Sequence, residues 1–292
     1  MRPSRIALVG GSGQLGTALR DALAGRDLIA PPHAELALED PPAVGRLLDG
    51  TRPDVLVNCS AFHHVDSCER EPERAFAINA LAVDAAAAAC AARGVTFVTV
   101  STDYVFDGTL GRAYREDDAI GPLTAYGASK AAGEALTRRH GDRHLIVRTS
   151  GVFGTTGTSS KGYTLIEKVL RQAERREPTR MVADMVFSPS YAPHVARALR
   201  DLLDAGCFGT YHVTNAGACS WFEFVEAAFA KAGLDAPLEP VTYAELGNPT
   251  RRPMFSPLDS TRLHDAGIAP LPRWDAALDE FLAARSARLT PS

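Results

Sequence analysis

Short apolar runs alternate with longer, alanine-rich segments through the first half of the chain. The apolar runs are predicted to form buried strands at 6–9, 28–30, 55–57, 96–100 and 145–147. Between them, apolar residues recur at helical spacing and predict helices over 16–24, 78–92 and 126–140. Strands that alternate with helices in this way pair in parallel. The pattern therefore predicts an α/β fold with a doubly wound parallel sheet.

The pattern changes after Arg148. Residues 151–162 are rich in Gly, Ser and Thr and are predicted to form a loop. Further on, Ser220 and Glu223 have the spacing of a capping box and predict the start of a helix. A final amphipathic helix is predicted over 274–289. Residues 151–292 are therefore expected to form mainly a smaller α+β lobe.

The composition is that of an ordinary globular protein, with 46% hydrophobic and 23% charged residues among 292. A net charge of -4 argues against nucleic acid or a membrane surface as a partner. No apolar run is judged long enough to cross a bilayer, and the first residues lack a signal-peptide pattern. A cytoplasmic location is therefore expected. The five cysteines form no C-x-x-C pair and are interpreted as reduced thiols.

A glycine-rich turn follows the first predicted strand and opens the first helix. Its residues are Gly10, Gly11, Ser12, Gly13, Gln14, Leu15 and Gly16, which match G-x-G-x-x-G. Glycines there let the backbone approach a pyrophosphate closely, and the helix N-terminus offers unpaired N–H groups. Residues 1–150 are therefore predicted to form a dinucleotide-binding domain, to which about 182–212 also return.

The choice between NADH and NADPH stays open at this point. The acidic residue expected after the second strand to bind the adenosine ribose of NAD is missing, because Pro31, Pro32 and His33 occupy that stretch. No arginine follows that strand to receive the 2′-phosphate of NADP. The hydroxyl of Ser12 can donate one hydrogen bond to that phosphate, which favours NADPH slightly.

Tyr126 and Lys130 stand four residues apart on a predicted helix, so their Cβ atoms lie about 5–6 Å apart on one face. A tyrosine has an ordinary pKa near ~10, and the ammonium group is expected to lower that pKa by favouring the phenolate. The tyrosine can then give its proton to a carbonyl oxygen while hydride reaches the carbon. Such pairs are common on solvated helices. Here the pair follows Thr102, at the end of a central strand where ligands of open α/β sheets bind.

Several motifs resemble the dTDP-4-dehydrorhamnose reductase family, an extended branch of the short-chain dehydrogenases/reductases. They are the glycine turn, residues 58–66, 101–108, 148–150, 209–213 and 251–253, and the Tyr126–Lys130 pair. The resemblance runs from residue 5 to about residue 263. It implies a Rossmann domain with a small sugar-nucleotide lobe. It also implies NAD(P)H-dependent reduction of the 4-keto group of a 6-deoxyhexose carried on a nucleoside diphosphate, with dTDP as the expected nucleotide.

The resemblance also assigns residues. Thr102, Tyr126 and Lys130 are the implied catalytic set, and Thr102 and Asp103 are expected to touch the sugar. Gly13, Gln14 and Leu15 fall on the pyrophosphate turn. The adenine end of the cofactor is assigned to Glu35 and Leu36, and its other half to Ser60, Ala61, Phe62, Tyr126 and Lys130.

The substrate side is assigned less directly. Gly151 stands where the family typically has a tryptophan that packs on the substrate, and the loop 154–162 is the candidate to replace that aromatic wall. A ketoreductase of a specialised deoxysugar pathway is therefore an equal interpretation. A guanidinium suits a diphosphate, which makes Arg252 a candidate substrate ligand. Arg148 ends a predicted central strand and is interpreted as structural.

Two other functions are weighed. An epimerase or dehydratase uses the same scaffold, but Asp103 is followed by Tyr104 and not by the glutamate of the dehydratase branch. A regulatory subunit that binds NAD(P) without catalysis is the second alternative. For the protein itself, a homodimer is the assembly considered. His63, His64, Asp66 and Cys68 fit no zinc pattern, so no metal is expected.

Overall fold

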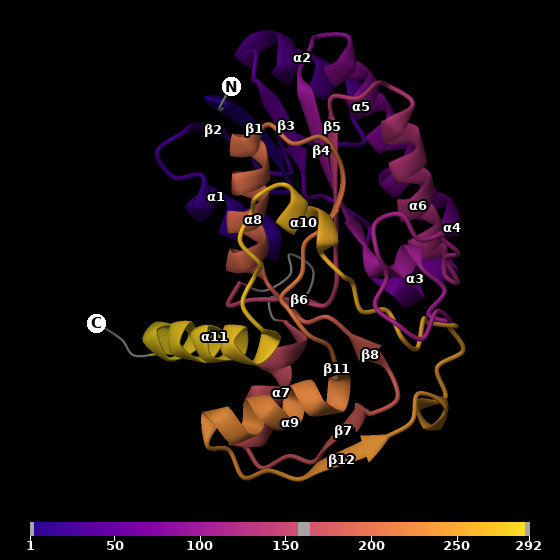
Figure 1. Ribbon diagram of the computed structural model, residues 1–292, viewed down its shortest axis with the longest axis vertical. Helices are drawn as coiled ribbons and strands as arrows, with labels where there is room; N and C mark the ends of the chain where they lie inside the picture. The colour runs from indigo at the N-terminus through magenta and orange to yellow at the C-terminus, as the bar shows by residue number, and fades with distance from the viewer. Residues whose placement is uncertain (1–2, 157–163, 290–292) are drawn as a thin grey trace.

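The computed structural model describes residues 3–156 and 164–289, and its centre is a parallel sheet of order β10-β5-β4-β3-β1-β2 (Figure 1). Its strands are β1 (Arg5–Val9), β2 (Asp27–Ile29), β3 (Val55–Asn58), β4 (Thr96–Thr102), β5 (His144–Thr149) and β10 (Gly209–His212). Every neighbouring pair in this sheet is parallel. The predicted doubly wound α/β fold is confirmed.

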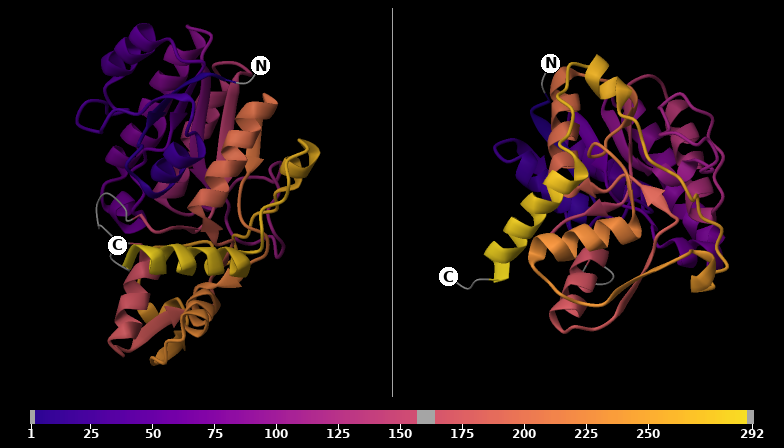
Figure 2. Two further views of the ribbon diagram at one scale, coloured as in Figure 1. Left: turned by 90° about the vertical axis from the view of Figure 1, so that its left-hand side faces the viewer. Right: turned by 60° about the horizontal axis from the view of Figure 1, so that its bottom comes forward.

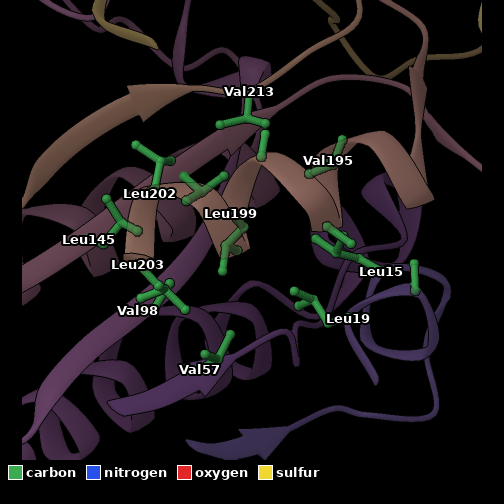
Figure 3. Close-up of a cluster of buried hydrophobic side chains, with 14 of the residues drawn as sticks. Leu15, Leu19, Val57, Val98, Leu145, Val195, Leu199, Leu202, Leu203 and Val213 are labelled. Carbon is green, nitrogen blue, oxygen red and sulfur yellow. The ribbon is translucent and has the colours of Figure 1, made fainter. Parts of the chain in front are cut away.

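Helices cover both faces of the sheet because successive strand residues point to opposite faces. The helices next to the sheet are α1 (Gln14–Ala22), α2 (Pro41–Thr51), α5 (Ala82–Ala91), α6 (Ala125–Arg138) and α8 (Ala192–Ala205). Ile6 and Leu8 pack into the cluster that α1 and α8 close, while Ala7 and Val9 pack into the cluster with α2 and α5. Figure 3 shows the first cluster, in which Leu19 and Leu199 converge on Val57 and Val98.

The chain returns to the sheet domain through α8 and β10. Helix α8 packs against α1, and β10 pairs in parallel with β5 at the edge of the sheet. The division at residue 150 stays a prediction. Helix α8, Val213, Leu263, Ile268 and Leu271 belong to the core cluster of the sheet domain, whereas buried residues of 166–181, 224–229 and 277–281 form a separate cluster.

The smaller lobe has its own aromatic core beyond the carboxyl ends of the strands (Figures 1 and 2). Its helices are α7 (Leu165–Glu174), α9 (Trp221–Ala232) and α11 (Trp274–Leu289). Its strands pair as β7 (Thr179–Val182) with β12 (Leu238–Val241), β8 (Val186–Phe187) with β11 (Cys219–Ser220), and β6 (Val152–Phe153) with β9 (Ser190–Tyr191). The predicted capping box is present at the start of α9. Part of the predicted loop 151–162 lies outside the described residues.

The shorter elements lie at the ends of strands and in the connections. They are α3 (Val65–Arg70), α4 (Pro72–Phe76), α10 (Thr261–Asp265), the π-helical turn η1 (Ala77–Leu81) and the 3₁₀ turns η2 (Asp103–Val105) and η3 (Ala244–Leu246).

The expectation that no apolar run could span a bilayer is wrong by length. One continuous helix, Pro72–Ala91, has 20 residues and a mean hydropathy of 1.4, enough to cross a membrane by length and composition. In the structure this helix packs against α2, α6 and β4, and 44% of its most apolar window is buried. Its buried apolar residues pack within the sheet domain, while Phe76 and Leu81 are exposed.

Candidate active site

The glycine turn is built for close backbone approach. Gly10 has φ +76°, and a Cβ there would lie 2.7 Å from the amide N of Ser60. A Cβ at Gly16 would lie 2.2 Å from the carbonyl O of Gly10, so only glycine lets α1 start so close to the turn. No side chain caps the N-terminus of α1, and the buried Oε1 of Gln14 has no hydrogen-bond partner within the described part of the chain. These features fit a pyrophosphate at this turn.

The loop after β3 is fixed next to the glycine turn by two asparagines. Asn58 Oδ1 accepts hydrogen bonds from Ser60 N (2.9 Å) and Ser60 Oγ (2.7 Å). Asn79 bonds both backbone groups of Phe62 at 2.9 Å and donates to Ser129 Oγ at 3.0 Å. Since Ser129 lies between Tyr126 and Lys130, Asn79 ties this loop to the helix of the Tyr–Lys pair.

Asn79 was missed in the sequence analysis. It lies in the π-helical turn η1, an irregularity that recurs at functional sites but is not visible as a periodicity in the sequence. Helix α6 approaches this turn closely, because a Cβ at Gly133 would lie 2.2 Å from the carbonyl O of Asn79.

The two residues assigned to the adenine end lie after β2. Leu36 is buried in the core cluster with Val9 and Leu38, while Glu35 is exposed. The side chain of Leu36 is thus used for packing. A contact with adenine by either residue stays a prediction.

Thr102 ends β4 and is positioned by Asp103. Its Oγ1 donates to Asp103 Oδ1 at 3.0 Å and accepts from Tyr104 N at 3.2 Å. The other carboxylate oxygen of Asp103 accepts from Ser150 Oγ (2.9 Å) and Ser256 Oγ (2.6 Å). Burial raises the pKa of Asp103, and the three hydroxyl donors oppose that shift. With both oxygens engaged, Asp103 is better suited to orienting Thr102 than to contacting a sugar, so its assignment to the substrate stays a prediction.

Tyr126 lies next to Thr102 because α6 packs tightly on η2. A Cβ at Gly127 would lie 2.1 Å from the carbonyl O of Tyr104, and the rings of Tyr104 and Tyr126 meet edge to face at 5.9 Å. Thr124 caps α6 by accepting from Gly127 N at 2.9 Å. The structure therefore brings Thr102 and Tyr126 together, as the sequence predicted.

The expected lowering of the Tyr126 pKa is wrong. Burial raises the pKa of Tyr126 above its ordinary value, and a hydrogen bond with Thr102 only partly opposes this. Lys130 is also buried, and its Nζ donates to Val100 O at 2.6 Å. Burial lowers the pKa of Lys130 to about 8, against the attraction of Glu134. Loss of water around each group is the largest cause of its pKa shift.

A buried ion pair supports the lysine from the next turn of α6. Glu134 accepts from Arg148 Nε (2.8 Å) and Nη2 (2.7 Å), and also from Ser101 Oγ (2.6 Å). Burial alone would raise the pKa of Glu134, but the hydrogen bonds from Arg148 hold it below its ordinary value. This pair joins α6 to β4 and β5, which agrees with a structural role for Arg148.

Gly151 leaves no room for a larger residue. It has φ +48°, and a Cβ there would lie 2.2 Å from Cε2 of Phe187. Phe187 is buried and stacks on the partly buried Trp221, with ring centroids 3.9 Å apart. A tryptophan at position 151 would have to displace this stack. Aromatic rings from β8 and α9 therefore stand beside the position from which the family's tryptophan is missing.

Arg252 reaches from the smaller lobe to the sheet domain. Its Nη2 donates to Asp66 Oδ1 at 2.7 Å, and its buried Nε has no partner within the described residues. Cys68 donates to Phe62 O at 3.2 Å. Protein groups thus engage both Asp66 and Cys68.

Comparisons with known proteins agree with this geometry. The model of the family described as "RmlD substrate binding domain" matches residues 4–287. "Spore coat polysaccharide biosynthesis protein SpsK" of Bacillus subtilis is 38% identical over 97% of this chain and 98% of its own length. A "dTDP-4-dehydrorhamnose reductase" of Streptomyces griseus is 36% identical over 97% of this chain and 95% of its own.

Among solved structures, dTDP-4-dehydrorhamnose reductase from Bacillus anthracis in complex with NADP superposes with a TM-score of 0.92. It is 32% identical and covers 97% of this chain and 100% of its own. The family match spans nearly the whole chain, and each of the two relatives above 30% identity covers 97% of it. The chain therefore belongs to the dTDP-4-dehydrorhamnose reductase family.

Proposed function

We propose that this chain reduces the 4-keto group of a nucleotide-linked 6-deoxyhexose, with dTDP as the nucleotide. Its membership of the family makes it an NAD(P)H-dependent oxidoreductase. The observation that carries the proposal is the meeting of Thr102, Tyr126 and Lys130 at the carboxyl end of β4, beside the loop that packs on the glycine turn.

The residues present fit a dinucleotide. The amides at the start of α1 and the side chain of Gln14 would hold the pyrophosphate, while Ser60, Ala61 and Phe62 would line its nicotinamide half. Lys130 would hold the nicotinamide ribose. When bound, the reduced nicotinamide supplies the hydride that reaches C4 of the sugar.

The raised pKa of Tyr126 suits a reduction. A ketone that receives hydride needs a proton on its oxygen, and a partly buried tyrosine with a raised pKa carries that proton at neutral pH. Tyr126 Oη donates to O4 as the C4–H bond forms, which yields a hydroxyl and leaves a phenolate. The Lys130 ammonium stabilises that phenolate until it takes a proton from solvent. The Thr102 hydroxyl has a single proton, which it donates to Asp103 in the structure, and it would donate to the carbonyl oxygen by turning that proton from Asp103 to the bound ketone.

On the substrate side, we propose that Arg252 contacts the diphosphate and that the sugar lies near Gly151. The unpartnered Nε of Arg252 is available for an anion, although Nη2 is held by Asp66. The stacked rings of Phe187 and Trp221 support an aromatic surface next to Gly151. The residues that line this surface differ from the family pattern, so a ketoreductase of another deoxysugar pathway is included in the test.

The test measures oxidation of NADPH and NADH by the purified protein with a panel of nucleotide-linked 4-keto-6-deoxy sugars. We expect one equivalent of cofactor to be consumed per sugar reduced, with the dTDP-linked ketone as the best substrate. Conversion of a sugar nucleotide without net cofactor consumption would indicate an epimerase or dehydratase. Nucleotide binding without turnover of any ketone would indicate a regulatory subunit.

The depressed pKa of Lys130 predicts how activity depends on pH. Below pH 8 the buried amine is protonated and holds the ribose and the phenolate; above about 8 it loses its charge. We therefore expect kcat/KM to fall as pH rises through about 8, and Lys130→Met to remove that step along with most of the activity. Initial rates from pH 6 to 10 at constant ionic strength check this. A wild-type profile flat to pH 10 would contradict it.

A further inference from the structure

Arg20 lies where the glycine turn meets the end of β2. It is exposed near the end of α1, and its Nη1 approaches Ala30 O at 3.5 Å. The same nitrogen lies 3.4 Å from where a Cβ at Gly11 would stand, and the Cβ of Ala30 lies 3.5 Å from that point. The side chain runs back toward the N-terminus of α1, as helical side chains do. It thus places a guanidinium over the turn.

This position is the adenosine end of the dinucleotide site. In parallel sheets of this kind the adenosine ribose lies at the carboxyl end of the second strand, close to the glycine turn. An acidic residue there binds the 2′-hydroxyl of NAD and repels a 2′-phosphate. Here the strand continues into Ala30, Pro31, Pro32 and His33, without a carboxylate.

The charge of Arg20 is not neutralised locally. Within the described residues, Arg20 forms no salt bridge with a carboxylate, and its hydrogen-bond partner is the backbone carbonyl of Ala30, at the limit of hydrogen-bond distance. The hydroxyl of Ser12 is exposed on the same turn. A guanidinium with free donors beside a hydroxyl is a chemistry suited to a phosphate monoester.

The sequence alone did not reveal this group. The sequence pattern places an arginine for the 2′-phosphate after the second strand, whereas Arg20 reaches the same place from the first helix, ten residues before Ala30 in the chain. Arg20 also lies in the last turn of α1, where a cation stabilises the helix C-terminus. That role would not distinguish one nucleotide from another.

We propose that Arg20 binds the 2′-phosphate of NADPH and makes the protein prefer NADPH to NADH. The proposal rests on the dinucleotide site of the proposed function, but not on the identity of the sugar. It requires Arg20 to discriminate between two ligands that differ only in that phosphate.

The test is calorimetric titration of the full chain with adenosine 2′,5′-bisphosphate and with 5′-AMP, which differ only in the 2′-phosphate. We expect wild type to bind the bisphosphate more tightly. Arg20→Gln is expected to weaken its binding about tenfold to a hundredfold, as for a lost charge-assisted hydrogen bond, and to leave 5′-AMP unchanged. Arg20→Lys should keep part of the preference. The matched control is Arg46→Gln, which removes the same charge from an exposed position of α2. It should change neither the affinity for the bisphosphate nor that for 5′-AMP.

The outcomes separate the two proposals. Equal affinity of wild type for both nucleotides overturns the role of Arg20. An equal loss of affinity for both nucleotides in Arg20→Gln overturns it as well. Thermal unfolding of each variant shows whether α1 is intact, and Arg20→Lys repeats the comparison if Arg20→Gln is unstable. Failure to bind either nucleotide would overturn the cofactor site itself. Selective binding of the bisphosphate without turnover of any keto-sugar would support Arg20 and overturn only the proposed reaction.

Discussion

Replacement of Tyr126 by phenylalanine is expected to lower kcat by about 10²- to 10⁴-fold, the usual contribution of a positioned general acid. The substitution removes one hydroxyl and keeps the ring that packs edge to face on Tyr104. Single-turnover measurements with the keto-sugar that proves active would show the loss directly in the chemical step.

The affinity for the cofactor is expected to stay within about twofold in this variant, because binding depends on the glycine turn and on Lys130. Tyr104→Phe is the matched control, since Tyr104 is the neighbouring tyrosine and burial raises its pKa to about 12 as well. Its loss should reduce kcat far less. Equal effects of the two substitutions would show that the defect comes from packing and would contradict the assignment of Tyr126 as the acid.

Features that depend on residues close together in the sequence could be predicted, and features that depend on distant residues could not. The strands β1 to β5 and the Tyr126–Lys130 spacing were predictable because periodicity and i,i+4 geometry are local properties of the chain. The helix Pro41–Thr51 was missed, because it has Pro at its start, two internal glycines and a short apolar face of Ala43, Val44 and Leu48.

The electrostatics of the site could not be predicted in the same way. Tyr126 and Lys130 were expected to act on each other, but their pKa values are set first by burial, which depends on packing against β4 and η2. Arg20 and Asn79 join the site through contacts with residues ten and seventeen positions away, from elements of different type. Such convergence is a property of the assembled sheet and leaves no pattern in a local window.

Loss of Arg148 should produce the largest change in stability. Arg148→Met removes both hydrogen bonds to Glu134, whose side chain is only 1% exposed, and leaves that carboxylate with Arg138 as its remaining cation. Removing one partner of a buried pair costs about 3–5 kcal/mol because the other charge stays buried. Urea unfolding of wild type and variant, followed by two optical probes, measures this difference. The control is Arg175→Met, which breaks the exposed pair with Glu177 and should cost less than about 1 kcal/mol.

The pH dependence of this stabilisation follows from Glu134. The pKa of Glu134 in the folded chain is held below its ordinary value. The ionised carboxylate therefore contributes its full stabilisation above the pKa that Glu134 has in the unfolded chain. That stabilisation is lost as the pH falls through the pKa of Glu134 in the folded chain. The difference in the free energy of unfolding between wild type and Arg148→Met should therefore shrink in acid, and a difference that stays constant would contradict the ion-pair explanation.

Arg148 is followed by Thr149 and Ser150, and Ser150 donates to Asp103. Loss of the pair should for this reason also disturb Thr102, so kcat is expected to fall in Arg148→Met even where the protein remains folded.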